Sequence, residues 1–474
     1  MATVERSVFH PEVREYAEVN RDAMRLLTKP GKGYLLLLGL TIAAVGLMLL
    51  AEAAQILWGL GLSGLTNPVG WGVMITTFVF WVGIGHAGTL ISAILFLFRA
   101  GWRQSIYRIA EAMTVFAVLT AGLFPVFHVG RPWFAYWLIP LPSQRQIWPN
   151  TRSPLEWDVF AVTTYLTVSS VFFFIGLIPD IAAARDATDV PWRKKAYTLL
   201  ALGWKGTDRE WKHFTRAYLF LAALATPLVL SVHSVVSWDF AVSIVPGWHT
   251  TIFAPYFVAG AILSGVAMVV TIAVPVRKIF HLEKYLTLLH FDRLAKLLLL
   301  TSLIVGYAYA MEYFMAWYSG ELYERDVFWD RVTGDYWWAG WSMITMNALI
   351  PQLLWFKRVR LNLNGFFVIS IIVNIGMWFE RFVIIVPSLA HSYEPWKFMN
   401  YHIGITEAGL LIGSFGWFFM WFLLFLRFLP GLSIAEIKEI LPPPLKHGHA
   451  RPQLHPEHAV VAEEPPTASE KERP

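Results

Sequence analysis

Long apolar runs alternate with short polar connections along most of the chain. A helix needs about 20 apolar residues to cross roughly 30 Å of hydrocarbon. Runs of that length fall near 34–60, 70–98, 107–128, 158–179, 216–236, 251–275, 293–317, 337–356, 365–388 and 404–429. The pattern therefore predicts an all-α integral membrane protein of about ten transmembrane helices.

Composition agrees with that class and narrows the chemistry. Of 474 residues, 56% are hydrophobic and only 15% are charged, against about 25% charged in a typical soluble domain. The chain has no cysteine, which excludes disulfides, an iron–sulfur cluster ligated by this chain and covalent c-type haem. No predicted helix carries two histidines a membrane-span apart, so we also expect no haem, and no metal site.

Basic residues set the expected orientation, because cytoplasmic loops are enriched in Lys and Arg. They gather in the N-terminal arm, on alternate loops and in the C-terminal tail; the loop examples are Arg99, Arg103, Arg108, Arg193, Lys194, Lys195, Arg277, Lys278, Lys357, Arg358 and Arg360. We therefore expect both termini to face the cytoplasm. The first thirty residues are polar and of mixed charge, so they do not resemble a cleavable signal peptide.

Three regions follow from these patterns. Residues 1–33 form a cytoplasmic arm, either an amphipathic segment on the membrane or a partner, or a solvated tail. Residues 34–430 form the membrane domain, and residues 431–474 a largely extended cytoplasmic tail that is disordered or clasps a neighbour. Helices 2–5 and 6–9 have the same orientation and suggest two parallel four-helix bundles, with helices 1 and 10 peripheral. Small residues in helices 2 and 6, such as Gly83 and Gly265, would permit close contact.

Ionisable residues inside hydrocarbon are costly, so each needs a reason. One group lies near the outer ends of helices 3, 4 and 5, and it consists of His128, Arg131, Trp157 with Asp158, His233, Trp238 with Asp239, and His249. Two Trp-Asp pairs and three histidines thus meet at one membrane boundary. A second group lies deeper and consists of His86, Glu111, Glu312, Glu380, Arg381 and Glu407.

Oxidation of a quinol would use such a set, because a quinol loses two protons with its two electrons. Neutral His and ionised Asp accept protons readily. Our hypothesis is that His128 hydrogen-bonds the ring and Asp158 takes a proton. Each residue also has a plain structural interpretation: Asp158 as a helix cap, His128 as a ring bonded to a loop carbonyl, and Arg131 as a snorkelling side chain.

The other members have alternatives too. Asp239 and His233 are more often structural, since Asp at a helix exit bonds turn amides. His86 is either a buried histidine bonded to a neighbouring helix or a residue that contacts quinone or relays protons. Glu380 and Arg381 are most simply interpreted as a buried ion pair.

Four stretches carry a resemblance to a known family. They are SVHSVVSWDFAVSIVPGWHTTIFAPYFVAGAI (231–262), WVGIGHAGTLISAILFLFRAGWRQSIYRIAEAMTVFAV (81–118), FPVFHVGRPWFAYWL (124–138) and SPLEWD (153–158). They resemble the NrfD/PsrC family of quinone-interacting membrane subunits, and within it the larger, ActC-type subunit of alternative complex III. The resemblance covers about residues 30–430.

The resemblance implies a bacterial inner-membrane subunit without a redox cofactor of its own. It implies menaquinone or another quinone as substrate, bound near the periplasmic face beside an iron–sulfur subunit of ferredoxin-like or molybdopterin-like type. Further partners would be c-type haem subunits and a second NrfD-like subunit, in contact with membrane lipid and without nucleic acid. His128 and Asp158 match the positions expected to contact and deprotonate quinol. His86, Arg131, Trp157, His233 and Asp239 would line the pocket, and Glu111, Glu312, Glu380, Arg381 and Glu407 would form a proton route.

Two other functions compete with this one. A proton-coupled transporter would need broken helices at mid-depth around a charged substrate site, and no paired Gly/Pro interruption is evident. A non-catalytic anchor in the same kind of complex would not require His128 together with Asp158.

Overall fold

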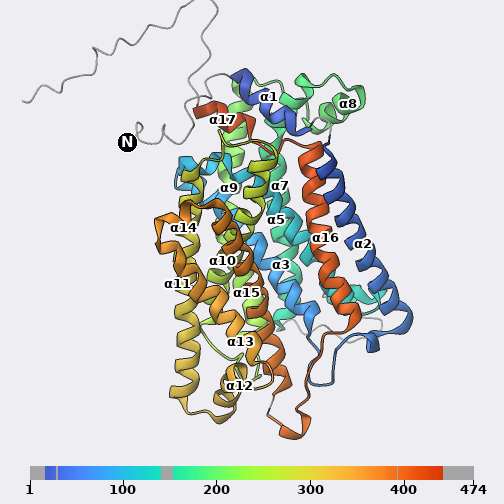
Figure 1. Ribbon diagram of the computed structural model, residues 1–474. Helices are drawn as coiled ribbons and strands as arrows, with labels where there is room; N and C mark the ends of the chain where they lie inside the picture. Colours follow the sequence, from blue (N-terminus) through green and yellow to red (C-terminus); the bar gives the residue numbers. More distant parts are fainter. Residues whose placement is uncertain (1–15, 28–29, 140–152, 392, 441–474) are drawn as a thin grey trace, which may run out of the picture.

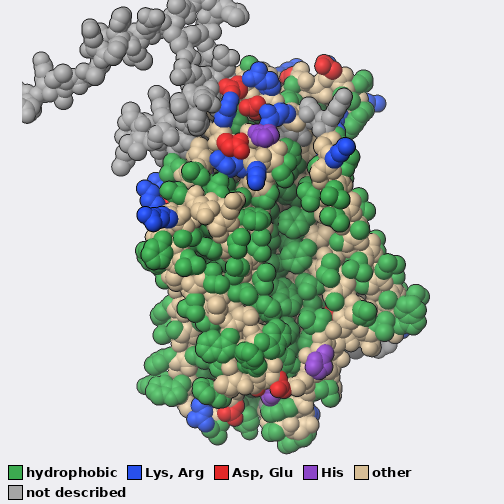
Figure 2. Space-filling model, in the orientation of Figure 1, with side chains coloured by type: hydrophobic (Ala, Val, Ile, Leu, Met, Phe, Trp, Pro, Cys, Tyr) green, Lys and Arg blue, Asp and Glu red, His purple; other side chains and the backbone are tan. Residues whose placement is uncertain are grey.

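The computed structural model describes residues 16–27, 30–139, 153–391 and 393–440. Within these ranges the chain is helical and contains no strand (Figure 1). On the face shown in Figure 2, apolar side chains cover the middle of the molecule, and charged side chains gather toward its two ends. This distribution is the one expected of a protein that spans a membrane.

Within the described residues, nine of the ten predicted segments are long and apolar enough to span. They are α2 (Lys32–Trp58), α3 (Val73–Thr89) extended through η3 (Leu90–Ile94) and α4 (Leu95–Leu97), α5 (Tyr107–Ala121) with α6 (Leu123–His128), α7 (Pro154–Ala187), α9 (Asp208–Ala241), α10 (Phe253–Ile279), α11 (Leu288–Ser319), α15 (Leu363–Ala390) and α16 (Ile405–Phe428).

The tenth predicted segment, 337–356, is helical but broken. It consists of α13 (Trp337–Ile344), the π-helical turn η6 (Thr345–Leu349) and the 3₁₀ turn η7 (Ile350–Trp355). Pro351 has no backbone N–H to donate, which favours a change of helix type at this point. The segment packs on α11 and α15, so it keeps its predicted place in the bundle.

The membrane-spanning segments form two four-helix sets and one separate pair of helices. The first set, α3, α5 with α6, α7 and α9, and the second set, α10, α11, α13 to η7 and α15, meet where α3 packs on α10 (Figure 1). A Cβ on Gly265 of α10 would lie 2.3 Å from Cβ of Ala87, so glycine is needed for this close approach, as the sequence predicts. Helices α2 and α16 pack on each other at the edge.

Short helices cover the two ends. At one end, here named the α1 face, lie α1 (Tyr16–Leu27), α8 (Pro191–Leu200) and α17 (Ile434–Ile440); at the other, the α12 face, lies α12 (Leu322–Thr333) (Figure 1). The remaining short turns are η2 (Leu60–Leu62), η4 (Gly101–Ser105), η5 (Pro132–Leu138), α14 (Lys357–Leu361) and η8 (Pro395–Lys397).

Helix α1 is fixed to the protein at its α1 face. Lys284 Nζ lies 2.6 Å from Glu18 Oε1, and Tyr285 donates to Asp22 at 3.0 Å. Arg193 donates to the carbonyl of Leu27 at 2.5 Å. Helix α1, the described part of the predicted N-terminal arm, therefore contacts both α8 and the loop that follows α10. Of the predicted tail, α17 is helical and packs on α1 and α7, and residues 441–474 lie outside the described residues.

Two helices are longer than predicted, which moves several candidate residues. Helix α7 begins at Pro154, not 158, and continues through Pro179 to Ala187. Helix α9 continues to Ala241, five residues beyond the predicted end at 236. Proline inside a membrane helix is tolerated because neighbouring groups satisfy the freed carbonyl, so the predicted helix end at Pro179 is wrong.

Candidate functional site

Two carboxyl groups meet where α7 and α9 approach the α12 face. Asp158 lies one turn inside α7 and is 7% exposed, and its carboxyl group lies within hydrogen-bonding reach of that of Asp239, two residues before the end of α9. A hydrogen bond between two carboxyl groups needs a proton on one of them, because an ionised carboxylate only accepts. Oδ1 of each residue is buried without a partner. The pair is therefore placed to share a proton, and its unpartnered oxygens could accept another.

Tryptophans flank the carboxyl pair. The rings of Trp157 and Trp238 pack edge to face with centroids 6.1 Å apart, and each side chain is 38% exposed. The two Trp-Asp pairs thus meet at one boundary, as the sequence predicts. Their apolar rings face outward beside a polar pair, which suits a flat, lipid-soluble molecule.

His128 ends α6 at the same face, and its Nδ1 is buried without a partner. The turn before it is held by α2, because Gln55 donates to the carbonyl of Phe127 at 2.6 Å. Neither a hydrogen bond nor an ion pair joins His128 to Asp158 among the described residues. Arg131, at the start of η5, is exposed and does not line a buried site.

Sequence reasoning missed Glu52, one turn from Gln55 on α2. It is 8% exposed, and both its carboxylate oxygens are buried without a partner. The signal was present in the sequence, because Glu52 is an acidic residue inside an otherwise apolar run.

Two histidines meet in the interior of the first set. The rings of His86 and His233 lie 4.3 Å apart, and both residues are buried. Nε2 of His86 and both ring nitrogens of His233 have no hydrogen-bond partner of good geometry. His233 was predicted at the outer boundary, which is wrong: because α9 extends to Ala241, His233 lies about 12 Å inside its end at 1.5 Å per residue.

Polar side chains continue from the histidines toward the α1 face. The ring of Tyr165 stacks on His86 with centroids 5.2 Å apart. Its hydroxyl lies 2.7 Å from the hydroxyl of Thr89 and donates to the carbonyl of Gly85 at 2.9 Å. Thr114 donates to the same carbonyl at 2.7 Å.

Glu111 belongs to a buried ionic cluster at the α1 face. Arg108 contacts Glu111 at 3.1 Å and Asp180 at 2.8 Å, and Tyr218 donates to Glu111 at 3.0 Å. Asp180 also accepts the backbone N–H of Ala435 at 2.9 Å.

The sequence pattern predicts Arg103 and Arg108 in a basic loop, whereas they lie in η4 and α5 and are buried. Arg103 is 4% exposed and Arg108 1%, because Glu436 pairs with Arg103 at 3.0 Å and two acidic residues pair with Arg108. Sequence reasoning missed Asp180 because it follows Pro179, where helix 4 is predicted to end.

The second set contains the predicted pair Glu380 and Arg381, which is confirmed as an ion pair at 3.0 Å. Tyr309 donates to Glu380, and Asn347 donates to Tyr309 at 2.9 Å. The guanidinium of Arg381 also lies 4.3 Å from the ring centre of Phe257. Glu312 is buried on α11, and its Oε1 has no partner.

Glu407 lies in the first turn of α16, at the α12 face and not deep in the bundle. Its carboxylate accepts the backbone N–H groups of Gly64 at 2.8 Å and Gly404 at 3.0 Å. It thereby caps the helix and holds the loop after η2. In the part of the chain that the structure describes, no cluster of three His, Asp or Glu side chains could hold a metal ion.

Comparison with known proteins adds three relatives, all membrane or complex subunits of reductases or oxidoreductases. The chain is 22% identical over 424 residues to a selenate reductase subunit of Mesobacillus selenatarsenatis, covering 84% of this chain and 93% of that protein. It is 20% identical to an Hdr-like menaquinol oxidoreductase integral membrane subunit of Archaeoglobus fulgidus, covering 71% and 75%. It is 27% identical to a putative dimethyl sulfoxide reductase membrane subunit of Halobacterium salinarum, covering 52% of this chain and about half, 51%, of that protein.

The family model for polysulphide reductase, NrfD, matches residues 61–391. That range runs from η2 to the end of α15 and includes both four-helix sets, the carboxyl pair and the histidine pair. The chain therefore belongs to the NrfD polysulphide reductase family of membrane proteins, as its motifs predicted.

Proposed function

We propose that this chain is the quinol-oxidising membrane subunit of a respiratory or photosynthetic complex like alternative complex III. Its site is at the α12 face of the first set, and its substrate is menaquinol or another quinol. The observation that carries the proposal is the close approach of the carboxyl groups of Asp158 and Asp239, which have no cationic partner among the described residues. The Archaeoglobus relative is named as a menaquinol oxidoreductase subunit, which supports the choice of substrate.

Each residue of the site has a separate role in this proposal. The quinol ring lies between His128 and Asp158, with Trp157 beside it. Both O–H bonds break: one proton goes to the His128 ring and the other to the carboxyl pair, and two electrons leave to an iron–sulfur acceptor. Asp239 holds the proton shared within the pair and so positions Asp158.

The electron acceptor belongs to a partner, because this chain has no cysteine to ligate an iron–sulfur cluster. The proposed partners are haem subunits of the c type, a periplasmic iron–sulfur protein and a second NrfD-like protein, all in or on a bacterial inner membrane. The α1 face, where α1 and α17 lie, is then cytoplasmic, and the α12 face meets the iron–sulfur protein.

A proton route through the first set completes the proposal. The carboxyl pair, His86 with His233, Tyr165 with Thr114, and Glu111 follow one another from the α12 face to the α1 face. The second set contributes Glu312, Glu380 and Arg381 in the same role. Buried polar groups in a membrane domain are the usual parts of proton relays.

Substitution of the two proposed catalytic residues tests the function. In the assembled complex, His128→Ala and Asp158→Asn should each lower quinol oxidation by about a hundredfold or more, the range for loss of a general base. Asp186→Asn, an exposed residue at the other end of the same helix, is the matched control and should leave turnover unchanged. If the two variants oxidise quinol at the wild-type rate and the purified complex holds no quinone, the chain is an anchor.

A further inference from the structure

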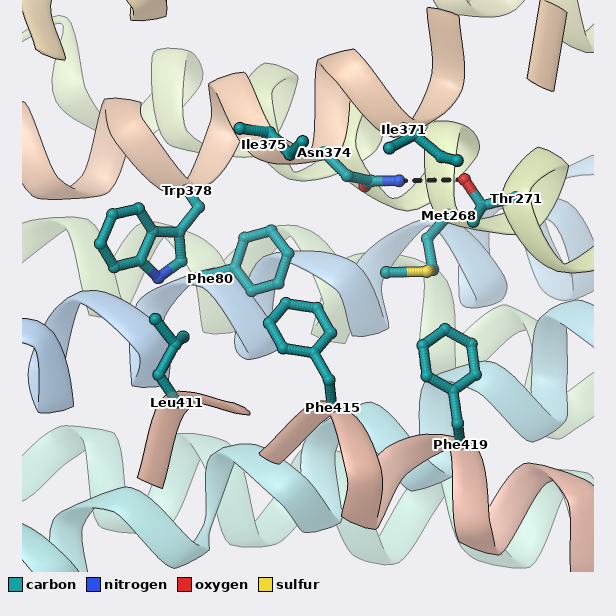
Figure 3. A pocket seen from close by; sticks show the side chains of 10 residues that line it. All are labelled: Phe80, Met268, Thr271, Ile371, Asn374, Ile375, Trp378, Leu411, Phe415 and Phe419. Atoms are coloured by element: carbon teal, nitrogen blue, oxygen red, sulfur yellow. Dashed lines mark hydrogen bonds between the residues drawn. The ribbon is translucent and has the colours of Figure 1, made fainter. Parts of the chain in front are cut away.

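An elongated cavity of about 290 Å³ lies at the seam between the two helix sets and α16 (Figure 3). Its walls come from four helices: Phe80 on α3, Met268 on α10, Ile375 and Trp378 on α15, and Leu411 and Phe415 on α16. None of the proposed site residues lines it.

The walls of the cavity are mostly apolar and favour a hydrocarbon ligand. Two polar side chains reach the cavity, and they bond each other: Asn374 donates to Thr271 at 3.2 Å, as the dashed line in Figure 3 shows. Thr271 also lies 2.9 Å from the hydroxyl of Ser370. The amide oxygen of Asn374 is buried and has no hydrogen-bond partner, so it could satisfy at most one donor of a ligand. A ligand with several polar groups would lose its hydration here and gain little in return, whereas an apolar chain has no polar group to leave unpaired.

The dimensions of the cavity fit a single alkyl chain. The α16 wall runs from Leu411 to Phe419, eight residues or about 12 Å along the helix axis. A transmembrane helix with its side chains is about 10–12 Å across, far too wide for a cavity of about 290 Å³. A single alkyl chain can lie along it.

Charge at one end supplies the headgroup site. Lys278 lies seven residues beyond Thr271 on α10, which places it two turns closer to the α1 face on the same side of the helix, and it is exposed. Basic side chains lie among acidic ones at that end of the molecule, above the apolar surface (Figure 2). Basic groups at the end of a groove between membrane helices bind anionic headgroups.

We propose that this seam is a binding site for one anionic phospholipid, with an acyl chain in the cavity and the headgroup phosphate at Lys278. The lipid fills the gap where α3, α10, α15 and α16 would otherwise leave a void, and so it fixes α16 against the two sets. The proposal is independent of quinol oxidation.

Filling the cavity tests it. In the purified complex, Leu411→Trp should remove one tightly bound phospholipid per chain, measured by mass spectrometry of extracted lipid. Ile412→Trp is the matched control, because its side chain is 53% exposed next to Leu411 and does not line the cavity; it should keep the lipid. Ile375→Trp fills the same cavity from α15 and should repeat the loss if Leu411→Trp fails to assemble.

Two further measurements separate the possible occupants. Lys278→Gln should abolish the preference for anionic over zwitterionic phospholipid when vesicles of each are offered to delipidated complex. Quinone content, measured in the same extracts, should not change in either tryptophan variant. The proposal is overturned if the filled variants keep their phospholipid, if they lose quinone instead, or if a photoreactive residue at position 375 cross-links to a partner protein rather than to lipid.

Discussion

The two ends of the first helix set use the same residue types in opposite ways. At the α1 face, Arg108 contacts Glu111, Asp180 and the carbonyl of Gly176, with distances of 3.1, 2.8 and 2.7 Å. At the α12 face, the carboxyl group of Asp158 lies next to that of another acid, Asp239. One end pairs its carboxylates with a cation, and the other pairs carboxyl with carboxyl.

This difference distinguishes residues that stabilise the fold from residues that exchange protons. The buried carboxylate of Asp180, held by Arg108 and the backbone N–H of Ala435, has little to gain from binding a proton. A carboxyl pair with unpartnered oxygens gains a hydrogen-bond donor with each proton it accepts. We therefore expect substitution of Arg108 or Asp180 to lower stability first, and substitution of the carboxyl pair at the α12 face to lower turnover first.

The largest expected effect is on turnover at the α12 end. Asp239→Asn should lower quinol oxidation by about a hundredfold or more, as for Asp158→Asn, because the pair works as one unit. The double variant should be scarcely slower than either single variant, with assembly and thermal unfolding unchanged. Steady-state rates of the three complexes check this, and strictly multiplicative losses would mean that the two acids act separately.

The next effect is on stability at the α1 end. Arg108→Met leaves Glu111 and Asp180 buried without their cation, which should cost about 3–5 kcal/mol and much of the assembled complex. The matched control is Arg185→Met at the same end, where the partner Asp186 is 68% exposed and the loss should be about 1 kcal/mol or less. Thermal unfolding in detergent distinguishes them, and equal losses would contradict the assigned role.

The smallest effect is a pH dependence at the α12 face, where one carboxylate does have a cationic partner. Nδ1 of His391 lies 3.0 Å from the carboxylate of Asp330, and this contact raises the pKa of His391. A raised pKa in the folded state gives stability that is full below the ordinary value of about 6.5 and lost as pH rises through the raised value. The unfolding temperature should therefore fall slightly on going from acidic to mildly alkaline pH.

His391→Gln should remove this part of the pH dependence, at about 1 kcal/mol or less. Turnover in that variant should match the wild type across the same pH range. A fall in turnover would mean that His391 belongs to the quinol site.

Apolar run length was enough to predict nearly all the spanning helices, because hydrocarbon thickness fixes that length. It also brought Asp158 and Asp239 to one boundary. Helix ends were less accessible, because Pro179 resembles a terminator in isolation but is accommodated inside α7. Because α7 was predicted to end at Pro179, Asp180 was not recognised as a membrane residue. Because α9 was predicted to end at 236, His233 was placed too close to the outer boundary.

Pairing across helices could not be predicted from one sequence. Arg108 looked like a loop arginine because its partners lie three residues away on the next turn and on another helix. The contact of His86 with His233 depends on how α3 and α9 pack, which no local pattern encodes. The sequence identifies ionisable residues that are costly to bury in the membrane, but tertiary packing decides which of them are paired.

The most direct test of the central claim is an infrared difference spectrum recorded when quinol is added to the oxidised complex. If the carboxyl pair accepts a quinol proton, a protonated-carboxyl band should appear in the wild type, vanish in Asp158→Asn and Asp239→Asn, and persist in Asp186→Asn. A band that survives in both pair variants, or that is absent from the wild type during turnover, would contradict the account.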